Sequence, residues 1–386
     1  MDEDEDILAI CAAAAVSQLK SLQETTATAT ATVLAVVNDS SATISRGRYL
    51  KRGSIPPFQF SVWYLTDTKG DELEFLHFIA LTRDSFDRLV AICDNFINSN
   101  PIRASSRRQN KRHSRPRRRA FRTRDIIAMG LKYLLSTAEV KQLHVQFGCC
   151  VSTYMDCVWF SMDAFIHCVG TCQEGKVYWD RSIHNLEKCA SLTKQFLDIV
   201  GVVAMVDGNK LISFEPSDHI LQNRDYNGWT KDVNRNLVLV WDPFGKIIDA
   251  AVNLPGCYHD SRSSLWCKIY DHVAKLPDGY KCVCDDAFCT VGKVKDKLVK
   301  TNEQYNEDTV SSKYDQQLTH LRQCSEWGNH VLTGTFRVLL KKLPTDNVRR
   351  AKIQWSCIFL HNWRTETVGR NQIKTSFENI RRESND

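Results

Sequence analysis

The chain has 386 residues, an apolar content of 43% and a formal net charge of +6. This is enough apolar material for two or three domains with hydrophobic cores, which excludes a small disulfide-stapled secreted domain. The 15 cysteines include no CxxC pair, so we expect reduced and mostly buried thiols and no structural zinc site. The apolar run at 7–16 follows acidic residues and is too short to cross a bilayer, so we expect neither secretion nor a membrane span.

Residues 1–55 are expected to form a mobile leader, because alanine-rich, threonine-rich and serine-rich stretches follow one another there. Residues 56–100 are predicted to form an N-terminal helical region. Thr82 is a suitable N-cap, and apolar side chains recur after it at helical spacing: Phe86, Leu89, Val90, Cys93, Phe96 and Ile97. This pattern indicates a packed helix.

Residues 101–124 are predicted to form a basic linker, since the segment 103–124 carries 11 Lys or Arg and no Asp or Glu. Such a tract cannot bury itself, so it is either a solvated charge run or an attractor for polyphosphate. We expect it to bind DNA and to act as a nuclear-import signal, which predicts that the protein resides in the nucleus. The candidate DNA-binding residues in it are Arg107, Arg108, Lys111, Arg112, Arg117, Arg118 and Arg119.

Residues 125–172 are predicted to form an all-α, helix-turn-helix-like region. The expected pieces are a helix over 124–135, a short segment over 139–147 and a third helix over 152–169. The short segment ends at Gly148, and Ser152 is the expected cap of the third helix. That helix contains Asp156 and Asp163 but no Lys or Arg, so it either packs against its neighbours or reads bases. Both interpretations stay open.

After residue 197 the periodicity changes, and strands alternate with helices. The expected elements are strands at 198–206 and 211–214, a hairpin of 236–241 and 246–252, a helix at 261–274, a strand at 280–284 and a helix at 316–340. This order predicts an α/β fold in which a mixed sheet is flanked by helices. Asp207 and Gly208 would then follow the first strand directly.

Four acidic residues stand at comparable places in these elements. Asp207, Asp260 and Asp285 each follow an expected strand, and Glu326 lies on the last expected helix. Each has an ordinary explanation, namely a turn, a helix cap, a strand-end pair and a solvated helix face. Together they predict one cluster at a sheet edge, where carboxylates repel one another unless a cation such as Mg²⁺ or Mn²⁺ is bound. Two such metal ions would suit in-line phosphoryl transfer.

Several segments of this region resemble PIF/Harbinger-type DDE transposases and the nucleases derived from them. They occur in the family's order and read MVDG, NRDYNGW, LVLVWDPFGKIID, NLPGCYHDS, CVCDDAF, LRQCSEWGNHVLTGTFRVL and IFLHNW. The resemblance covers about residues 197–363, and extends more weakly to the helical region before it. It implies an RNase H-like nuclease domain over 195–363, preceded by a helix-turn-helix region and followed by a polar tail over 364–386.

The resemblance also implies a divalent-metal-dependent endonuclease that cuts and joins DNA ends. The catalytic residues would be Asp207, Asp260 and Glu326, with Asp285 as an additional metal ligand and Asp286 as its rival. The family usually acts with a Myb/SANT-like partner, and transposases assemble as multimers, so both are expected here. The alternatives are a domesticated DNA-binding or scaffold protein that no longer cuts, and an RNase H-like nuclease that acts on RNA.

Three basic residues near the four acidic residues have roles that the sequence predicts less specifically. Arg224 and Lys231 lie between expected strands and either contact the DNA backbone or are surface charges. Arg322 lies one helical turn before Glu326, so it could pair with that carboxylate or hold a phosphate.

Overall fold

The computed structural model describes residues 55–100, 102, 121–194, 200–288, 292–300, 310–369, 371–373 and 375. For residues 310–316 it describes the backbone alone. From Pro57 onward these residues belong to one compact unit. The expected leader and the seven basic residues of the linker named above lie outside the described residues, apart from Ile55 at the end of the leader. The cysteines within the described ranges are free, and most are buried.

The first part of the unit is helical. Its elements are η2 (Phe58–Phe60), α2 (Val62–Thr68), α3 (Glu72–Ile79), α4 (Arg83–Ser99), α5 (Thr123–Leu135), α6 (Val140–Leu143), η4 (His144–Phe147) and α7 (Val151–Val169). Thr82 caps α4 as predicted, because its side chain accepts a hydrogen bond from the amide of Ser85. The predicted cap of α7 is wrong: the N-cap is Cys150, and Ser152 lies inside the first turn.

Helix α7 is a packed helix. All of its residues are described, and only Ser152, Asp156 and His167 among them are exposed. It packs against α4, α5 and α13 (Asn347–Thr367), so nearly every face of α7 is covered. This burial bears out the packing interpretation of the third helix. The helix before it is a single α turn continued by a 3-10 turn, and a helix-turn-helix function stays a prediction.

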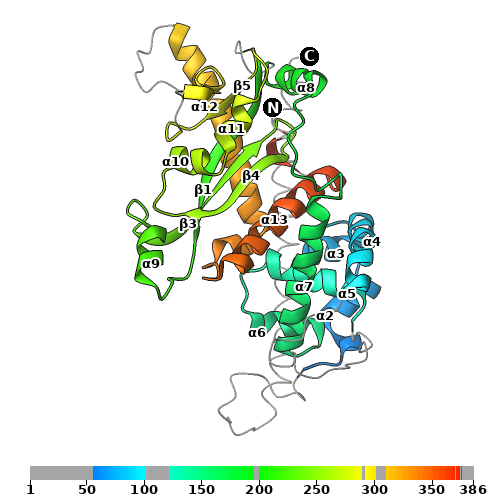
Figure 1. Ribbon diagram of the computed structural model, residues 1–386. Helices are drawn as coiled ribbons and strands as arrows, with labels where there is room; N and C mark the ends of the chain where they lie inside the picture. The colour runs from blue at the N-terminus through cyan, green and yellow to red at the C-terminus, as the bar shows by residue number, and fades with distance from the viewer. Residues whose placement is uncertain are drawn as a thin grey trace, which may run out of the picture. The chain divides into compact units, whose positions relative to one another are not determined.

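The second part of the unit is a mixed sheet with helices. Its elements are α8 (Ile183–Lys194), β1 (Val202–Ile212), α9 (His219–Asp225), β2 (Tyr226–Asn227), β3 (Asp232–Trp241), β4 (Ile247–Pro255), α10 (Asp260–Trp266), α11 (Ile269–Ala274), β5 (Lys281–Cys284), η5 (Gly292–Val294), β6 (Leu298–Val299), α12 (Val310–Thr335), η6 (Arg337–Leu340) and α13. Strand β3 pairs antiparallel with β1, β2 and β4, whereas β5 pairs parallel with β1 and β6. Figure 1 labels β1, β3, β4 and β5 of this sheet.

Strand β1 differs from its prediction. A single strand replaces the two that were expected, and Asp207 and Gly208 lie within it and form no turn. The reason is long-range pairing: β3 continues without a break from the pair Met205–Trp241 to the pair Ile212–Asn234, so the ladder satisfies the backbone of the whole segment.

Two further predictions can be compared with the structure. The β3–β4 hairpin is confirmed, and Gly245 adopts the left-handed conformation, with φ of 79°, that its turn requires. The helix expected over 261–274 is two helices, α10 and α11, because the chain turns at Lys268, where φ is 68°.

Alternate residues of the strands face two separate cores. On one face, side chains such as Met205, Leu239 and Trp241 pack with α12, α13 and the N-terminal helices. On the other face, side chains such as Val206 and Val240 pack with α8 and α11. This arrangement confirms a mixed sheet flanked by helices. Among the described helices, none has the length and apolar character needed to cross a bilayer.

Candidate active site

The position of Asp207 follows from the pairing of β1 with β5. Val206 pairs in parallel with Cys284, which is the last residue of β5. Asp207 is the next residue of β1 and Asp285 directly follows β5, so both lie at the point where the parallel pairing stops. The side chains alternate along each strand, which directs both residues to the face that α12 covers.

Two hydrogen bonds hold the Asp207 carboxylate. The amide of Gly208 donates to Oδ1 at 2.8 Å, and Nδ2 of Asn329 on α12 donates to Oδ2 at 2.9 Å. Asn329 is buried, and its own Oδ1 has no hydrogen-bond partner among the described residues. Asn329 was not among the predicted site residues, although its position three residues after Glu326 places it next to that residue on the helix.

Asp207 lies in an environment that disfavours its charge. Burial raises the pKa of Asp207 to about 7, against the lowering effect of the Gly208 amide. The negative charges of Asp285, Asp260 and Glu326 are smaller causes of the same rise to about 7. The four acidic residues proposed from the sequence are therefore close enough to act on one site electrostatically.

Asp260 is the first residue of α10, but it is not the helix cap. His259 is the N-cap, and no side chain caps this helix. The Asp260 carboxylate lies against Gly208 of β1, and its Oδ1 is buried without a hydrogen-bond partner in the described part of the chain. Burial raises the pKa of Asp260, the positive charge of Lys210 acts against this rise, and the charge of Asp285 adds to it. The capping explanation of Asp260 is thus wrong.

Arg322 joins the two remaining acidic candidates. Its Nη1 lies 2.9 Å from Oδ1 of Asp285, and its Nη2 lies 3.4 Å from Oε1 of Glu326, so the predicted pairing with Glu326 is present. The Glu326 side chain is 49% exposed, which leaves it accessible to solvent. Asp286 keeps one buried oxygen without a hydrogen-bond partner among the described residues, but it does not belong to these ion pairs.

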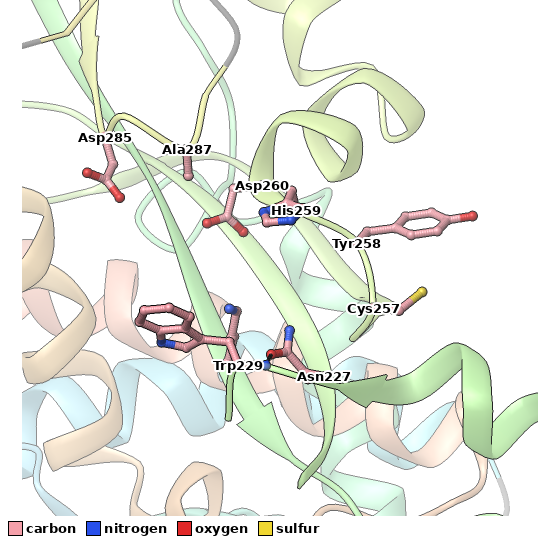
Figure 2. Close-up of a pocket in the computed structure, with 10 residues that line it drawn as sticks. Asn227, Trp229, Cys257, Tyr258, His259, Asp260, Asp285 and Ala287 are labelled. Carbon is pink, nitrogen blue, oxygen red and sulfur yellow. Dashed lines mark hydrogen bonds between the residues drawn. The ribbon is translucent and has the colours of Figure 1, made fainter. Parts of the chain in front are cut away.

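A cavity of about 680 Å³ opens beside Asp260 and Asp285, whereas Asp207 and Glu326 are not among the residues that line it (Figure 2). Asp260 and Asp285 are part of its wall, whereas Asp286 is not among the residues that line it. The other lining residues are Lys210, Asn227, Gly228, Trp229, Cys257, Tyr258, His259 and Ala287. The cavity therefore combines two carboxylates, one lysine and an exposed aromatic ring.

The carboxylate oxygens of this site are chemically suited to bind a hard divalent cation. Carboxylate oxygens are the preferred ligands of Mg²⁺ and Mn²⁺, and the buried, unpartnered Oδ1 of Asp260 lacks the compensation that a cation would supply. In the ranges that the structure describes, no three His, Cys, Asp or Glu side chains are grouped as a metal site. A cation held by these carboxylates together would therefore require them to move closer to one another, and Asp285 and Glu326 to release Arg322.

The basic residues predicted near the sheet have different surroundings. Arg224 lies at the end of α9 and forms an ion pair with the buried Asp225, which also pairs with Arg235. Lys231 is exposed in the turn between β2 and β3, with φ of 54°. Arg224 thus has a structural partner, whereas Lys231 lies on the surface close to Trp229.

Comparison with known families finds a match for the sheet region. Residues 206–362 match the family described as DDE superfamily endonuclease. This segment is therefore similar to DDE endonucleases, and the mixed sheet with its flanking helices is consistent with a DDE nuclease fold. The match supports the superfamily without distinguishing a subtype. Comparison with curated proteins and with solved structures gave no match.

Proposed function

We propose that this chain is a divalent-metal-dependent DNA endonuclease of the transposase type, which cuts and transfers DNA ends by in-line phosphoryl transfer. The similarity of residues 206–362 to DDE superfamily endonucleases supports the reaction class. The resemblance of the sequence motifs to PIF/Harbinger-type transposases, with an RNase H-like fold, is the more specific part of this proposal.

In this proposal, Asp207, Asp260 and Glu326 are the catalytic carboxylates, and Asp285 is a further metal ligand. Bound Mg²⁺ or Mn²⁺ would activate the attacking oxygen and stabilise the leaving oxygen. Asn329 holds Asp207 in place through its hydrogen bond. Asp285 is preferred to Asp286 because it lines the cavity and lies beside Asp207 across the β1–β5 pairing.

One observation carries this proposal above the others. Asp260 buries a carboxylate oxygen that has no partner among the described residues, directly against the residue that follows Asp207. Burying an ionised carboxylate without a partner costs several kcal/mol unless the group takes up a proton or a cation compensates its charge. A cation held jointly with the neighbouring carboxylates supplies that compensation.

Regions outside the sheet would contribute to DNA binding, nuclear import and assembly in the cell. The basic linker at 101–124 would attract the DNA backbone and direct the chain to the nucleus, and Lys231 would contribute a further phosphate contact. The helix-turn-helix-like region at 125–172 would add DNA contacts. We also propose self-association, which would bring two DNA ends together, and a Myb/SANT-like partner that assists DNA binding.

The proposal is tested by nicking of supercoiled DNA that carries the genomic flanks of the coding region. The wild-type chain is compared with Asp207→Asn, Asp260→Asn and Glu326→Gln, in Mg²⁺, in Mn²⁺ and in EDTA. Asp271→Asn is the matched control, because Asp271 lies on α11 in an exposed ion pair with Lys293. We expect metal-dependent nicking by the wild type and the control, and a loss of at least about a hundred-fold in each of the other three.

A second candidate is a domesticated DNA-binding or scaffold protein that keeps the fold without cutting. The ion pairs that Arg322 forms with Asp285 and Glu326 favour it, because they neutralise two candidate metal ligands without a metal. Binding of the DNA without nicking in either metal would support this alternative. Cleavage of a matched RNA–DNA hybrid in place of DNA would instead support the RNA-directed nuclease.

A further inference from the structure

Trp229 is exposed at the wall of the candidate active-site cavity. Its side chain is 88% exposed, although a tryptophan ring is among the largest apolar surfaces that a fold can bury. It lies in the turn between β2 and β3 and lines the same cavity as Asp260 and Asp285 (Figure 2). Packing within the chain therefore does not explain its position.

The backbone that carries this ring is fixed by a buried side chain. Asn227 is 7% exposed, and its Oδ1 accepts hydrogen bonds from the amides of Trp229 and Thr230, at 3.0 and 3.1 Å. The strand pair Tyr226–Val233 closes the base of the same turn. The indole is thus exposed on a rigid turn, which lowers the entropy cost of binding a ligand to it.

The same asparagine connects the turn to the segment that ends at Asp260. Nδ2 of Asn227 donates to the carbonyl oxygen of Gly256 at 2.7 Å, and Asp260 follows four residues later. A side chain at Gly256 would clash with backbone, because a Cβ there would lie 2.3 Å from the carbonyl oxygens of Asn234 and Asp225. Close backbone packing therefore sets the position of Trp229 relative to the acidic residues.

We propose that Trp229 stacks on an unpaired nucleobase of the DNA strand whose phosphodiester lies beside Asp260 and Asp285. This inference rests on the proposed function and deepens it. An exposed indole offers a flat face that stacks on any base, and the cationic Lys210 in the cavity and Lys231 in the same turn offer phosphate contacts.

The geometry also restricts the kind of substrate. A base inside a duplex has both faces covered by its neighbours, so it can stack on Trp229 only after it leaves the helix. The preferred substrate is therefore DNA that is locally single-stranded or opened beside the cut. Mismatched or frayed duplexes should bind better than perfect ones, because less energy is needed to unpair their bases.

Binding in the absence of metal tests this proposal directly. The full-length chain in EDTA is titrated with a labelled oligothymidylate of about 12 nucleotides, and with an abasic strand of the same length and charge. We expect Trp229→Ala to weaken binding of oligothymidylate about ten-fold, towards the affinity for the abasic strand, and Trp229→Phe to retain most of it. Quenching of tryptophan fluorescence by oligothymidylate should also shrink in Trp229→Phe.

Trp266→Ala is the matched control, since Trp266 is 65% exposed on α10 and is not among the described residues that line the cavity. It should bind both strands like the wild type. The proposal is overturned if the wild type binds oligothymidylate and the abasic strand with equal affinity. It is also overturned if Trp229→Ala binds oligothymidylate as tightly as the wild type, or loses the same factor of affinity for both strands.

Failure of this inference can be told apart from failure of the proposed nuclease function. If base binding depends on Trp229 but the protein does not nick DNA in Mg²⁺ or Mn²⁺, the proposed nuclease function is rejected and the proposed base-binding site is retained. Metal-dependent nicking that Trp229→Ala leaves intact, together with normal binding, would reject the base site and keep the nuclease.

Discussion

The carboxylate of Asp260 lies directly against the backbone of Gly208. A Cβ built on Gly208 would be 2.4 Å from Cγ of Asp260 and 2.5 and 2.6 Å from its two carboxylate oxygens. Because Gly208 follows Asp207 on β1, this contact joins two candidate catalytic residues that are 53 positions apart in the chain. The absence of a side chain at one position thus decides where a carboxylate can lie at another.

Substituting Gly208 by Ala should therefore reduce activity much more than stability. The new Cβ displaces the end of the Asp260 side chain, which can rotate away, while alanine is tolerated in a strand. We expect metal-dependent nicking to fall about a hundred-fold, as for other displacements of a catalytic group by about 1 Å, with a change in unfolding free energy below about 1 kcal/mol. Gly334→Ala on α12, where a Cβ meets nothing within 4 Å, should leave nicking unchanged.

Asp260→Asn should reduce the stabilisation by Mg²⁺ without lowering the metal-free stability. Asparagine has the same shape without the charge whose burial raises the pKa of Asp260. In EDTA, the melting temperature should therefore stay equal or rise by about 1–3 °C, whereas stabilisation by Mg²⁺ should shrink. Thermal unfolding with and without Mg²⁺ checks this, with Asp271→Asn as control. A lower melting temperature in EDTA would mean that the carboxylate has a structural role.

Arg322→Gln should make the protein more dependent on divalent cations. The substitution removes the positive charge between Asp285 and Glu326, so their repulsion is no longer compensated. We expect metal-free stability to fall by about 1 kcal/mol, since the ion pairs are partly exposed, and the melting temperature to rise more steeply with MgCl₂ than in the wild type. Arg322→Lys should be intermediate, because lysine cannot contact both carboxylates with one planar group. An unchanged MgCl₂ dependence would contradict this competition.

His361 should make the fold sensitive to acid. It is buried on α13, where Nε2 lies 3.0 Å from the carbonyl oxygen of Gly245, and burial lowers its pKa from 6.5 to about 4. The unfolded chain binds a proton between these two values and the folded chain does not, so this contribution to stability is lost as pH falls from 6.5 through 4.

The stability difference between His361→Gln and the wild type isolates this effect. Urea unfolding at several pH values should show that, as pH falls from 6.5 to 4, the free energy of unfolding of the wild type decreases by up to roughly 3 kcal/mol more than that of the variant. Asp242 lies in the turn that His361 contacts, and burial raises the pKa of Asp242 to about 6. This raised pKa makes the free energy of unfolding increase as pH falls, which is opposite to the effect of His361. Both proteins contain Asp242, so its contribution cancels in the difference. Parallel slopes for the two proteins would refute the assignment to His361.

Local signals in the sequence were sufficient for several elements. The cap at Thr82, the β3–β4 hairpin, strand β5 and the helix that carries Glu326 were all predicted from residue spacing, capping and turn chemistry. These features depend on neighbours within a few residues, where steric preference and backbone hydrogen bonding act directly. The order of these elements also predicted the mixed sheet.

Long-range pairing decided what those signals could not. Asp207 lies inside β1 because β3, some 30 residues later, continues the ladder past it. Asn329 could not be distinguished from other polar residues of its helix until α12 was placed against β1, where it donates to Asp207. A side chain's role here depends on the partner that the fold brings to it.

The sequence by itself determined the kinds of residue available for chemistry: the four carboxylates of Asp207, Asp260, Asp285 and Glu326, and a concentrated basic tract in the linker. Only the tertiary structure decided which carboxylates are buried, which oxygen lacks a partner, and which charges Arg322 already compensates. The physical reason is that desolvation and Coulomb energies depend on the distances between atoms in the folded chain, and residue spacing along the sequence does not specify those distances.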